Sequence, residues 1–238
     1  MKPIIGIVMR PELSSGKKPI MYTYKVISTA IIKCGGIPLG IEPTETQKYF
    51  GKNLFDTFKM STENFLDTKQ IIDLCDGIIC QGGDDFYDYD LKIIKYCYDN
   101  DIPLLGICLG CQAMGYLFKG EVKRLDHLEH DCPGHKYSHR VVLNKDSKLY
   151  DILKVSSFMV NSRHRDYIVK TDLDVSCFSD DFLIEAVEDK HKKFFIGVQW
   201  HPEVMIEYDM LMKSLLIYFI NICLKDDFYD GAGTDQNC

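Results

Sequence analysis

The sequence has no hydrophobic run of membrane-spanning length. Its longest apolar stretch, residues 215–220, is far shorter than the ~18 residues that a transmembrane helix needs. The opening residues 1–8 are interrupted at once by Arg10 and Pro11, so they do not form the apolar region of a signal peptide. These absences predict a soluble, cytoplasmic protein that does not bind a membrane.

Positive charge is also scarce. The chain has 28 Lys and Arg against 35 Asp and Glu, which gives a formal net charge of -7. A nucleic-acid surface needs clustered positive charge. We therefore expect no nucleic-acid partner.

Repeats, linkers and disulfide-scaffold spacing are absent as well. We expect one domain over residues 1–225, because 238 residues with 46% hydrophobic content suit a single α/β domain. The polar residues 226–238 are expected to form a disordered tail. The ten cysteines are scattered along the chain, so buried free thiols are the expected state in a reducing cytoplasm.

The first half of the chain alternates short apolar runs with helical patterns, which is typical of βαβ units and a parallel sheet flanked by helices. The expected strands are residues 4–9, 37–41, 77–80 and 103–107, and the expected helices are residues 22–34, 67–74 and 90–98. Residues 44–67 show weak periodicity and stay unassigned, with room for a short helix.

The second half of the chain has a different pattern, in which short apolar runs are separated by polar turns. It predicts an added region of antiparallel strands and a final helix over residues 206–224. The expected strands are residues 141–143, 158–160, 173–178, 183–187 and 194–199.

Residues 103–118 hold the most informative pattern. An apolar strand ends at Ile107, Cys108 follows, and a helix begins at Leu109 or Gly110. This is the nucleophile-elbow arrangement with sulfur in place of the serine oxygen. The turn presents the side chain beyond the carboxyl edge of the sheet, where open α/β sheets bind ligands. The helix N-terminus favours a thiolate and directs the Leu109 N–H toward a developing oxyanion.

Two other interpretations of Cys108 stay open on this segment alone. One is a buried structural cysteine at a strand end. The other is a redox pair, because Cys108 and Cys111 form a Cys-x-x-Cys next to a βαβ pattern. A redox pair, however, needs none of the distal residues described next.

A second apolar strand delivers His201 at its end, and Pro202 terminates that strand. A cysteine nucleophile needs a base that later protonates the leaving amine, and His201 can serve as that base. Glu203, two residues on, can accept a hydrogen bond from the other ring nitrogen and fix the tautomer. A lone histidine on a strand is more often structural, but the nearby Glu203 and the upstream Cys108 favour a catalytic role.

Gly82 and Gly83 directly follow the expected strand at residues 77–80. Paired glycines let the backbone approach a substrate closely. Their N–H groups could complete an oxyanion hole with that of Leu109, although without the other segments a plain glycine turn would be the preferred explanation.

Together these segments resemble the class I glutamine amidotransferases, and in particular the stand-alone γ-glutamyl hydrolases of the peptidase C26 and γ-glutamyl-γ-aminobutyrate hydrolase group. The resemblance rests on the blocks at residues 106–112, 160–164 and 197–203. It implies a flavodoxin-like α/β fold with a Cys108–His201–Glu203 triad. It also implies a thioester intermediate that water hydrolyses. We expect no cofactor and no metal.

The resemblance further suggests substrate contacts. They are Gln112 in the first block, and Asn161, Ser162 and His164 in the second. For the second block, local turn structure is the competing explanation, because Asn and Ser readily bind their own backbone.

Three segments depart from the family pattern. No proline follows the glycine pair in residues 84–88, Arg165 and Asp166 replace the usual His-Gln, and residues 121–125 replace a polar Gln-Asp segment. These segments border the expected pocket, so they affect the choice of substrate more than the chemistry.

One loop is rich in metal-ligand residue types: His127, His130, Cys132, His135 and His139. Their spacing would suit zinc. A solvated polar loop at the mouth of the site is the competing interpretation and the favoured one, because no second, distant pair of ligands is apparent.

Three functions are consistent with the sequence. The favoured one is a free-standing cysteine hydrolase that releases glutamate and an amine from a small γ-glutamyl amide or glutamine. The alternatives are a glutaminase subunit that supplies ammonia to a separate synthase, and a non-catalytic binding module. A homodimer and a synthase complex both stay open as assemblies.

Overall fold

The computed structural model describes residues 1–44, 59–127 and 129–224. The expected disordered tail at residues 226–238 and most of the unassigned stretch at residues 44–67 lie outside the described residues. In the described part of that stretch, a helix begins at Thr62 and is capped by Ser61, whose side chain accepts a hydrogen bond from the Asn64 N–H.

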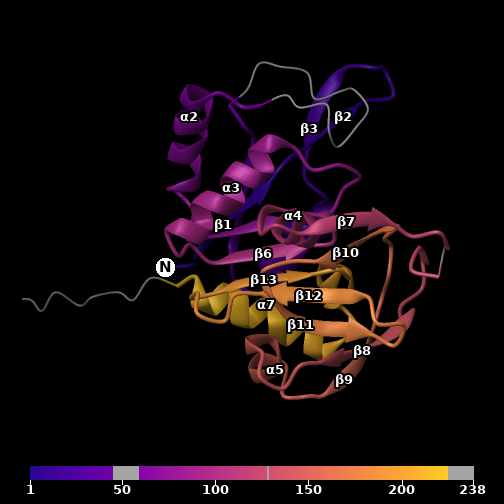
Figure 1. Ribbon diagram of the computed structural model, residues 1–238. Helices are drawn as coiled ribbons and strands as arrows, with labels where there is room; N and C mark the ends of the chain where they lie inside the picture. Colours follow the sequence, from indigo (N-terminus) through magenta and orange to yellow (C-terminus); the bar gives the residue numbers. More distant parts are fainter. Residues whose placement is uncertain (45–58, 128, 225–238) are drawn as a thin grey trace, which may run out of the picture.

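Five parallel strands form the upper half of a large sheet in Figure 1. In spatial order they are β4 (Ile37–Ile41), β1 (Ile4–Val8), β5 (Gly77–Cys80), β6 (Leu104–Ile107) and β13 (Phe195–Val198). The apolar runs of the four inner strands are largely buried, as expected for strands covered by helices on each side, whereas the edge strand β4 is partly exposed.

Antiparallel strands continue the same sheet beyond β13, in the lower half of Figure 1. In order they are β12 (Ile184–Glu188), β11 (Asp174–Ser179), β8 (His139–Leu143) and β9 (Ser157–Val160). Two further strands branch from β12: β10 (Asp166–Lys170) pairs with β12 and with β7 (Glu121–Arg124).

Helices cover both faces of the sheet and create two apolar cores. One core packs α1 (Lys25–Lys33), α5 (Lys148–Leu153), α6 (Pro202–Met205) and α7 (Met210–Ile222) against the sheet. The other packs α2 (Thr62–Ile72), α3 (Asp88–Asp99) and α4 (Leu109–Leu117) against the opposite face. The predicted α/β architecture, a parallel central sheet with an added antiparallel region, is confirmed.

A hairpin of β2 (Arg10–Leu13) and β3 (Pro19–Tyr22) lies between the first strand and the first helix, where the sequence predicted no element. The helix begins at Lys25 instead of residue 22. Arg10 anchors the hairpin through a buried ion pair with Asp90, at 2.6 Å between Nη2 and Oδ2. The hairpin is therefore held by a long-range charge pair that no local pattern indicates.

The predicted helix over residues 206–224 is also corrected, because it is interrupted before α7. Asp209 caps α7 by accepting hydrogen bonds from the N–H groups of Leu211 and Met212 at 2.9 and 3.1 Å. The strands β7 and β10 and the helix α5 were not predicted. Over the described residues, every helix falls short of the length and apolarity needed to traverse a bilayer.

Candidate active site

Three neighbouring parallel strands bring the candidate catalytic segments to one edge of the sheet. Strands β5, β6 and β13 lie side by side, with Cys80 opposite Gly106 and Ile107 opposite Val198. Because the carboxyl ends of parallel strands share one edge, the segments that follow these strands meet there.

Cys108 occupies the sharp turn between β6 and α4. Its backbone has φ 51° and ψ -103°, a strained conformation for a residue with a side chain. The Cys108 N–H is held by the Val198 carbonyl at 2.8 Å, which fixes the turn against β13. Cys108 lines a cavity beside the carboxyl edge of the sheet.

Gly110 permits this turn. A Cβ atom built at Gly110 would lie 2.1 Å from the Cys80 carbonyl oxygen, a distance that no real contact tolerates. The first turn of α4 therefore passes directly over the end of β5 only because residue 110 has no side chain.

His201 lies between Cys108 and Glu203. The His201 Nδ1 atom is 2.8 Å from Glu203 Oε1. The Cys108 sulfur lies near enough to the ring to influence its pKa. Burial alone would lower the pKa of His201, but the Glu203 carboxylate and the Cys108 sulfur raise it to about 10. The ring is therefore held as an imidazolium that can donate toward the sulfur.

Asn161 positions His201 through its backbone. The Asn161 amide donates to the His201 carbonyl at 3.0 Å and accepts from the His201 N–H at 2.8 Å. Asn161 is 1% exposed, and both its amide nitrogen and its amide oxygen bond the backbone of His201. Asn161 stays a predicted substrate contact, but its observed partner is the backbone of the histidine.

Gln199 is a residue of the site that the sequence analysis did not single out. Its Nε2 atom donates to the Cys108 sulfur at 3.5 Å, and its Oε1 accepts from Gln112 Nε2 at 3.2 Å. Gln112 also donates to the Asp166 carbonyl at 2.7 Å. The available signal was a polar amide at the end of an apolar strand, two residues before His201 and therefore on the same face.

The predicted oxyanion-hole residues lie around this site. A Cβ atom at Gly82 would lie 3.0 Å from His201 Cε1 and 3.6 Å from Cys108 Cβ, so the Gly82 backbone is adjacent to both. Gly83 lines the cavity, and Leu109 is the first residue of α4. Their role as donors to an oxyanion stays a prediction.

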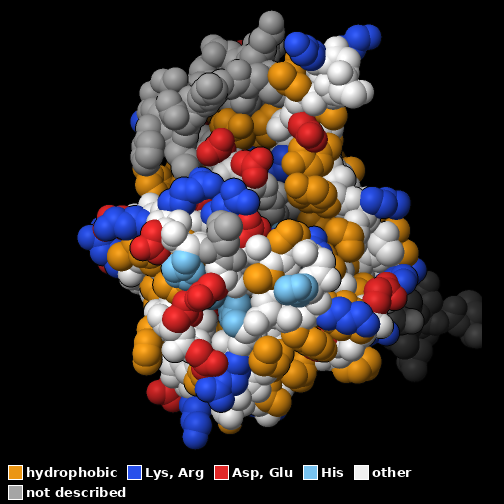
Figure 2. All heavy atoms as spheres, turned by 90° about the vertical axis from the view of Figure 1, so that its right-hand side faces the viewer, with side chains coloured by type: hydrophobic (Ala, Val, Ile, Leu, Met, Phe, Trp, Pro, Cys, Tyr) orange, Lys and Arg blue, Asp and Glu red, His pale blue; other side chains and the backbone are white. Residues whose placement is uncertain are grey.

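The cavity beside Cys108 has a volume of about 550 Å³ and a wall rich in charge of both signs. Arg165 is paired with Asp131 at 2.5 Å. Figure 2 shows a face on which basic side chains lie directly against acidic ones, with histidines close by. The charged wall residues are Asp84, Asp85, Arg124, Asp131, Arg163, Arg165 and Asp166.

The four predicted substrate contacts divide into two pairs. Gln112 and His164 line the cavity, whereas Asn161 and Ser162 are absent from the lining that the described residues provide. Ser162 is fully buried and donates to the His130 carbonyl at 2.6 Å. Ser162 thus ties the loop after β9 to the segment that contains His130.

Cys111, the other half of the Cys-x-x-Cys, lies on the buried side of α4. Its sulfur packs against Gly197 of β13, and burial raises the pKa of the thiol well above its usual range. Both cysteines are free thiols. These surroundings suit a packing role for Cys111 better than redox exchange.

Comparisons with known proteins identify the family and the fold. The family model of Peptidase C26 matches residues 84–203. A Schizosaccharomyces pombe protein, provisionally assigned as a glutamine amidotransferase, is 31% identical over 81% of this chain and 79% of its own length. The γ-glutamyl-CDP-amidate hydrolase of Campylobacter jejuni is 30% identical over 66% of this chain and 76% of its own. The Trypanosoma brucei CTPS glutaminase domain with bound acivicin has the same fold, with a TM-score of 0.66, 19% identity and 93% coverage of both chains.

Proposed function

The chain belongs to the Peptidase C26 family, within the class I glutamine amidotransferase-like superfamily, and from this premise we propose that it is a free-standing hydrolase of γ-glutamyl amides. The coarser activity, an amide hydrolase of the glutamine amidotransferase type, follows from the family. The finer one is supported above all by the hydrogen bond from His201 to Glu203, which orients the histidine beside the Cys108 sulfur.

In the proposed reaction, the Cys108 thiolate attacks the carbonyl carbon of the γ-amide. The N–H groups of Leu109 and of Gly82 or Gly83 stabilise the oxyanion that forms. The imidazolium of His201 gives its proton to the leaving amine, and the C–N bond breaks to leave a thioester on Cys108.

Water completes the cycle. The neutral His201 ring accepts a proton from a water molecule, whose oxygen attacks the thioester carbonyl. The C–S bond breaks, glutamate leaves and the thiolate with its imidazolium is restored. Glu203 keeps the His201 ring oriented and stabilises its positive charge in both steps.

The charged wall of the cavity supports a substrate that carries charges itself. Carboxylates suit the α-ammonium group of a γ-glutamyl moiety, and arginines suit its α-carboxylate. Arg124 and Arg163 also favour an amine product with an acidic group. The Campylobacter jejuni relative is, by its name, a hydrolase of one such conjugate, a γ-glutamyl-CDP-amidate.

We place the reaction in the cytoplasm and in a single domain of residues 1–225. A reducing compartment keeps Cys108 a thiol, as the reaction requires.

The proposal is tested by incubating the purified full chain with glutamine, neutral γ-glutamyl amines and γ-glutamyl conjugates of phosphorylated amines, and by measuring released glutamate. We expect turnover of at least one conjugate and its loss in Cys108→Ala. Cys34→Ser is the matched control, because Cys34 is a buried thiol at the end of α1, away from the site. Turnover of glutamine only in complex with a co-purifying synthase would instead assign a glutaminase subunit. No turnover in any setting, with an unreactive Cys108, would indicate a binding module.

A further inference from the structure

A second group of titratable side chains lies behind the cavity wall. His130 from the loop between β7 and β8, His139 at the start of β8, His164 from the turn after β9 and Glu185 of β12 each direct one atom to a common point. These ligand-type atoms all lie within 4.8 Å of one another. In the sequence, the candidate metal ligands were confined to the loop of residues 127–139. The fold brings His164 and Glu185, which are distant in the sequence, to His130 and His139 of that loop.

The atoms that converge are buried and have no hydrogen-bond partner among the described residues. They are His130 Nδ1, His139 Nε2, His164 Nε2 and both carboxylate oxygens of Glu185. Glu185 is fully buried, and His130 and His164 are 3% and 4% exposed. Buried polar atoms are nearly always satisfied in folded proteins, so this concentration points to a ligand.

The opposite ring nitrogens are already committed. His130 Nε2 bonds Asp181 Oδ2 at 3.0 Å, His139 Nδ1 bonds the Arg140 carbonyl at 3.3 Å, and His164 Nδ1 bonds the Asp166 carbonyl at 3.1 Å. Metal-binding histidines almost always donate their second ring nitrogen to a carboxylate or a backbone carbonyl. Each ring is thus oriented with its free nitrogen toward Glu185.

The spacings suit a cation better than direct hydrogen bonds. Glu185 Oε1 lies 3.4 Å from His130 Nδ1 and 3.6 Å from both His139 Nε2 and His164 Nε2. Hydrogen bonds between such atoms are usually about 2.7–3.2 Å. Ligands of a tetrahedral zinc ion at about 2.0–2.2 Å lie roughly 3.3–3.6 Å apart.

We propose that His130, His139, His164 and Glu185 form a structural site for a divalent transition-metal cation of the zinc class. Three imidazoles and one carboxylate complete a four-coordinate shell, and a closed shell of this kind is typical of structural zinc. The site goes beyond the proposed hydrolase activity and does not depend on it.

The cation would fix one wall of the catalytic cavity. Ser162 Oγ and the His164 N–H both donate to the His130 carbonyl, at 2.6 and 3.0 Å. The backbones of Asp131 and Arg163 form an isolated antiparallel β-bridge. The two segments that carry these residues provide Asp131, Arg163 and Arg165 to the cavity. In this assignment His164 is a metal ligand, and it lines the cavity without binding substrate.

The test is Zn²⁺ binding by the full chain without an affinity tag. The protein is stripped with a chelator, loaded with Zn²⁺, passed through gel filtration and analysed for zinc by mass spectrometry. We expect about one equivalent per chain and a rise in Tm with Zn²⁺, because a ligand that binds only the folded state stabilises it. Co²⁺ should give the intense visible absorption of a tetrahedral site.

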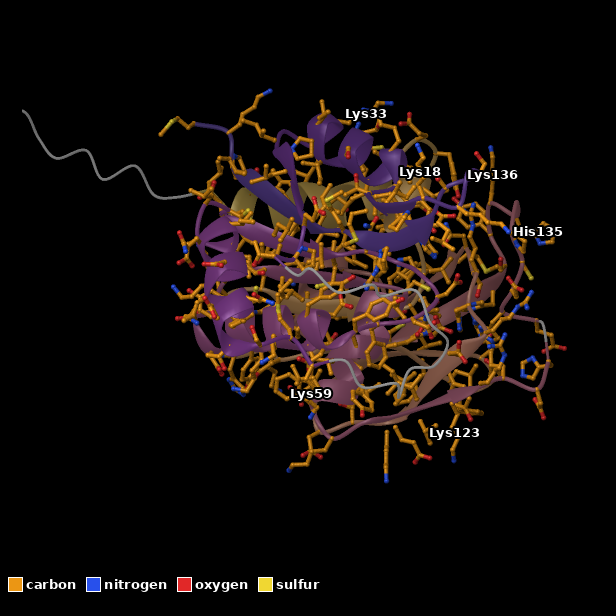
Figure 3. The ribbon with its side chains drawn as sticks, turned by 90° about the horizontal axis from the view of Figure 1, so that it is seen from above. Lys18, Lys33, Lys59, Lys123, His135 and Lys136 are labelled. Atoms are coloured by element: carbon orange, nitrogen blue, oxygen red, sulfur yellow. The ribbon has the colours of Figure 1, made fainter. Side chains whose placement is uncertain are left out.

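Variants then locate the ion. Glu185→Gln and His139→Gln should each lose the bound zinc and the Tm rise. His135→Gln should keep both, because His135 belongs to the same loop but projects from the outer edge of the molecule in Figure 3. Cys108→Ala should also keep both, which separates this site from adventitious binding at the catalytic thiol.

Less than about a tenth of an equivalent in the wild type, with no Tm rise, would overturn the site. So would zinc that survives in Glu185→Gln and His139→Gln but disappears in Cys108→Ala or His135→Gln. If the cluster variants do not fold, the stoichiometry, Tm and Co²⁺ spectrum of the wild type and of Cys108→Ala decide. All these readouts are independent of turnover, so failure of the hydrolase proposal would leave them interpretable.

Discussion

This protein has two sites at which histidine lies beside a buried glutamate. They differ in the distance between the histidine and the carboxylate and in the number of histidines. At the carboxyl edge of the parallel strands, His201 is hydrogen-bonded to Glu203 at 2.8 Å. In the antiparallel region, three histidines surround Glu185 at 3.4 to 3.6 Å. One group is a closed pair and the other is an open cluster.

The difference shows how the same residue types serve different chemistry. A close pair orients one ring and leaves its other side to exchange a proton with Cys108. In the open cluster each ring bonds an outer acceptor through one nitrogen, and its other nitrogen faces Glu185 without a hydrogen-bond partner among the described residues. Proton transfer needs the first arrangement, and cation binding needs the second.

The largest expected effect is on His201. Replacing it with Ala should reduce kcat by about 10⁵–10⁶-fold, because members of a triad act as a unit. Glutamate release measures the effect, and His191→Ala is the control because His191 is exposed and outside both groups. A loss smaller than tenfold would remove His201 from the proposed mechanism.

The same substitution in both groups sharpens the contrast. Glu203→Gln should reduce kcat by about 10³–10⁴-fold, because a neutral amide no longer stabilises the imidazolium. Glu185→Gln should change kcat by less than about tenfold, because Glu185 contacts no reacting atom and acts on the wall alone. Equal losses from the two variants would contradict the division of roles.

The His201–Glu203 pair should also make the free energy of unfolding depend on pH. The pKa of His201 is raised from 6.5 to about 10 in the folded protein, so the folded state binds the proton more tightly than the unfolded chain does. This stabilisation is fully present below about pH 6.5 and is lost as the pH rises toward 10.

Urea unfolding at pH 6, 8 and 10 would measure this loss for the wild type and for His201→Gln. The stability difference between the two proteins should shrink by a few kcal/mol over this range, since one pKa unit corresponds to about 1.4 kcal/mol. A difference that stays constant, or grows with pH, would show that His201 is not held as an imidazolium.

The closed pair and the parallel half of the fold were accessible from the sequence. Parallel strands buried on both faces are continuous apolar runs, and residues at their carboxyl ends must share one edge. His201 and Glu203 are two positions apart, so their proximity is a local property. Their catalytic roles, and those of Cys108 and the oxyanion-hole residues, remain predictions.

The antiparallel half was only partly accessible. Strand β7 has four residues, of which only Val122 is apolar, and α5 has six residues, so neither has a distinct period. The open cluster depends on the pairing of strands that are far apart in the sequence, because its members span residues 130–185. In the sequence, His130 and His139 are indistinguishable from His127 and His135, and only the strand pairing separates them.

Gln199 contacts both the catalytic site and the strand that carries Glu185. Its replacement is the prediction with the smallest expected change in kcat. The Gln199 side chain donates to the Cys108 sulfur, while its N–H bonds the Glu185 carbonyl at 2.8 Å and so connects the two regions. Gln199→Met removes the weak hydrogen bond to the sulfur and the one accepted from Gln112, keeps the backbone link and roughly preserves the side-chain volume. We expect kcat to fall by about three- to tenfold with zinc content unchanged, consistent with about 1 kcal/mol for such a bond. Steady-state kinetics beside zinc analysis measures both, and a loss of zinc in this variant would show that the two regions are coupled through more than the backbone.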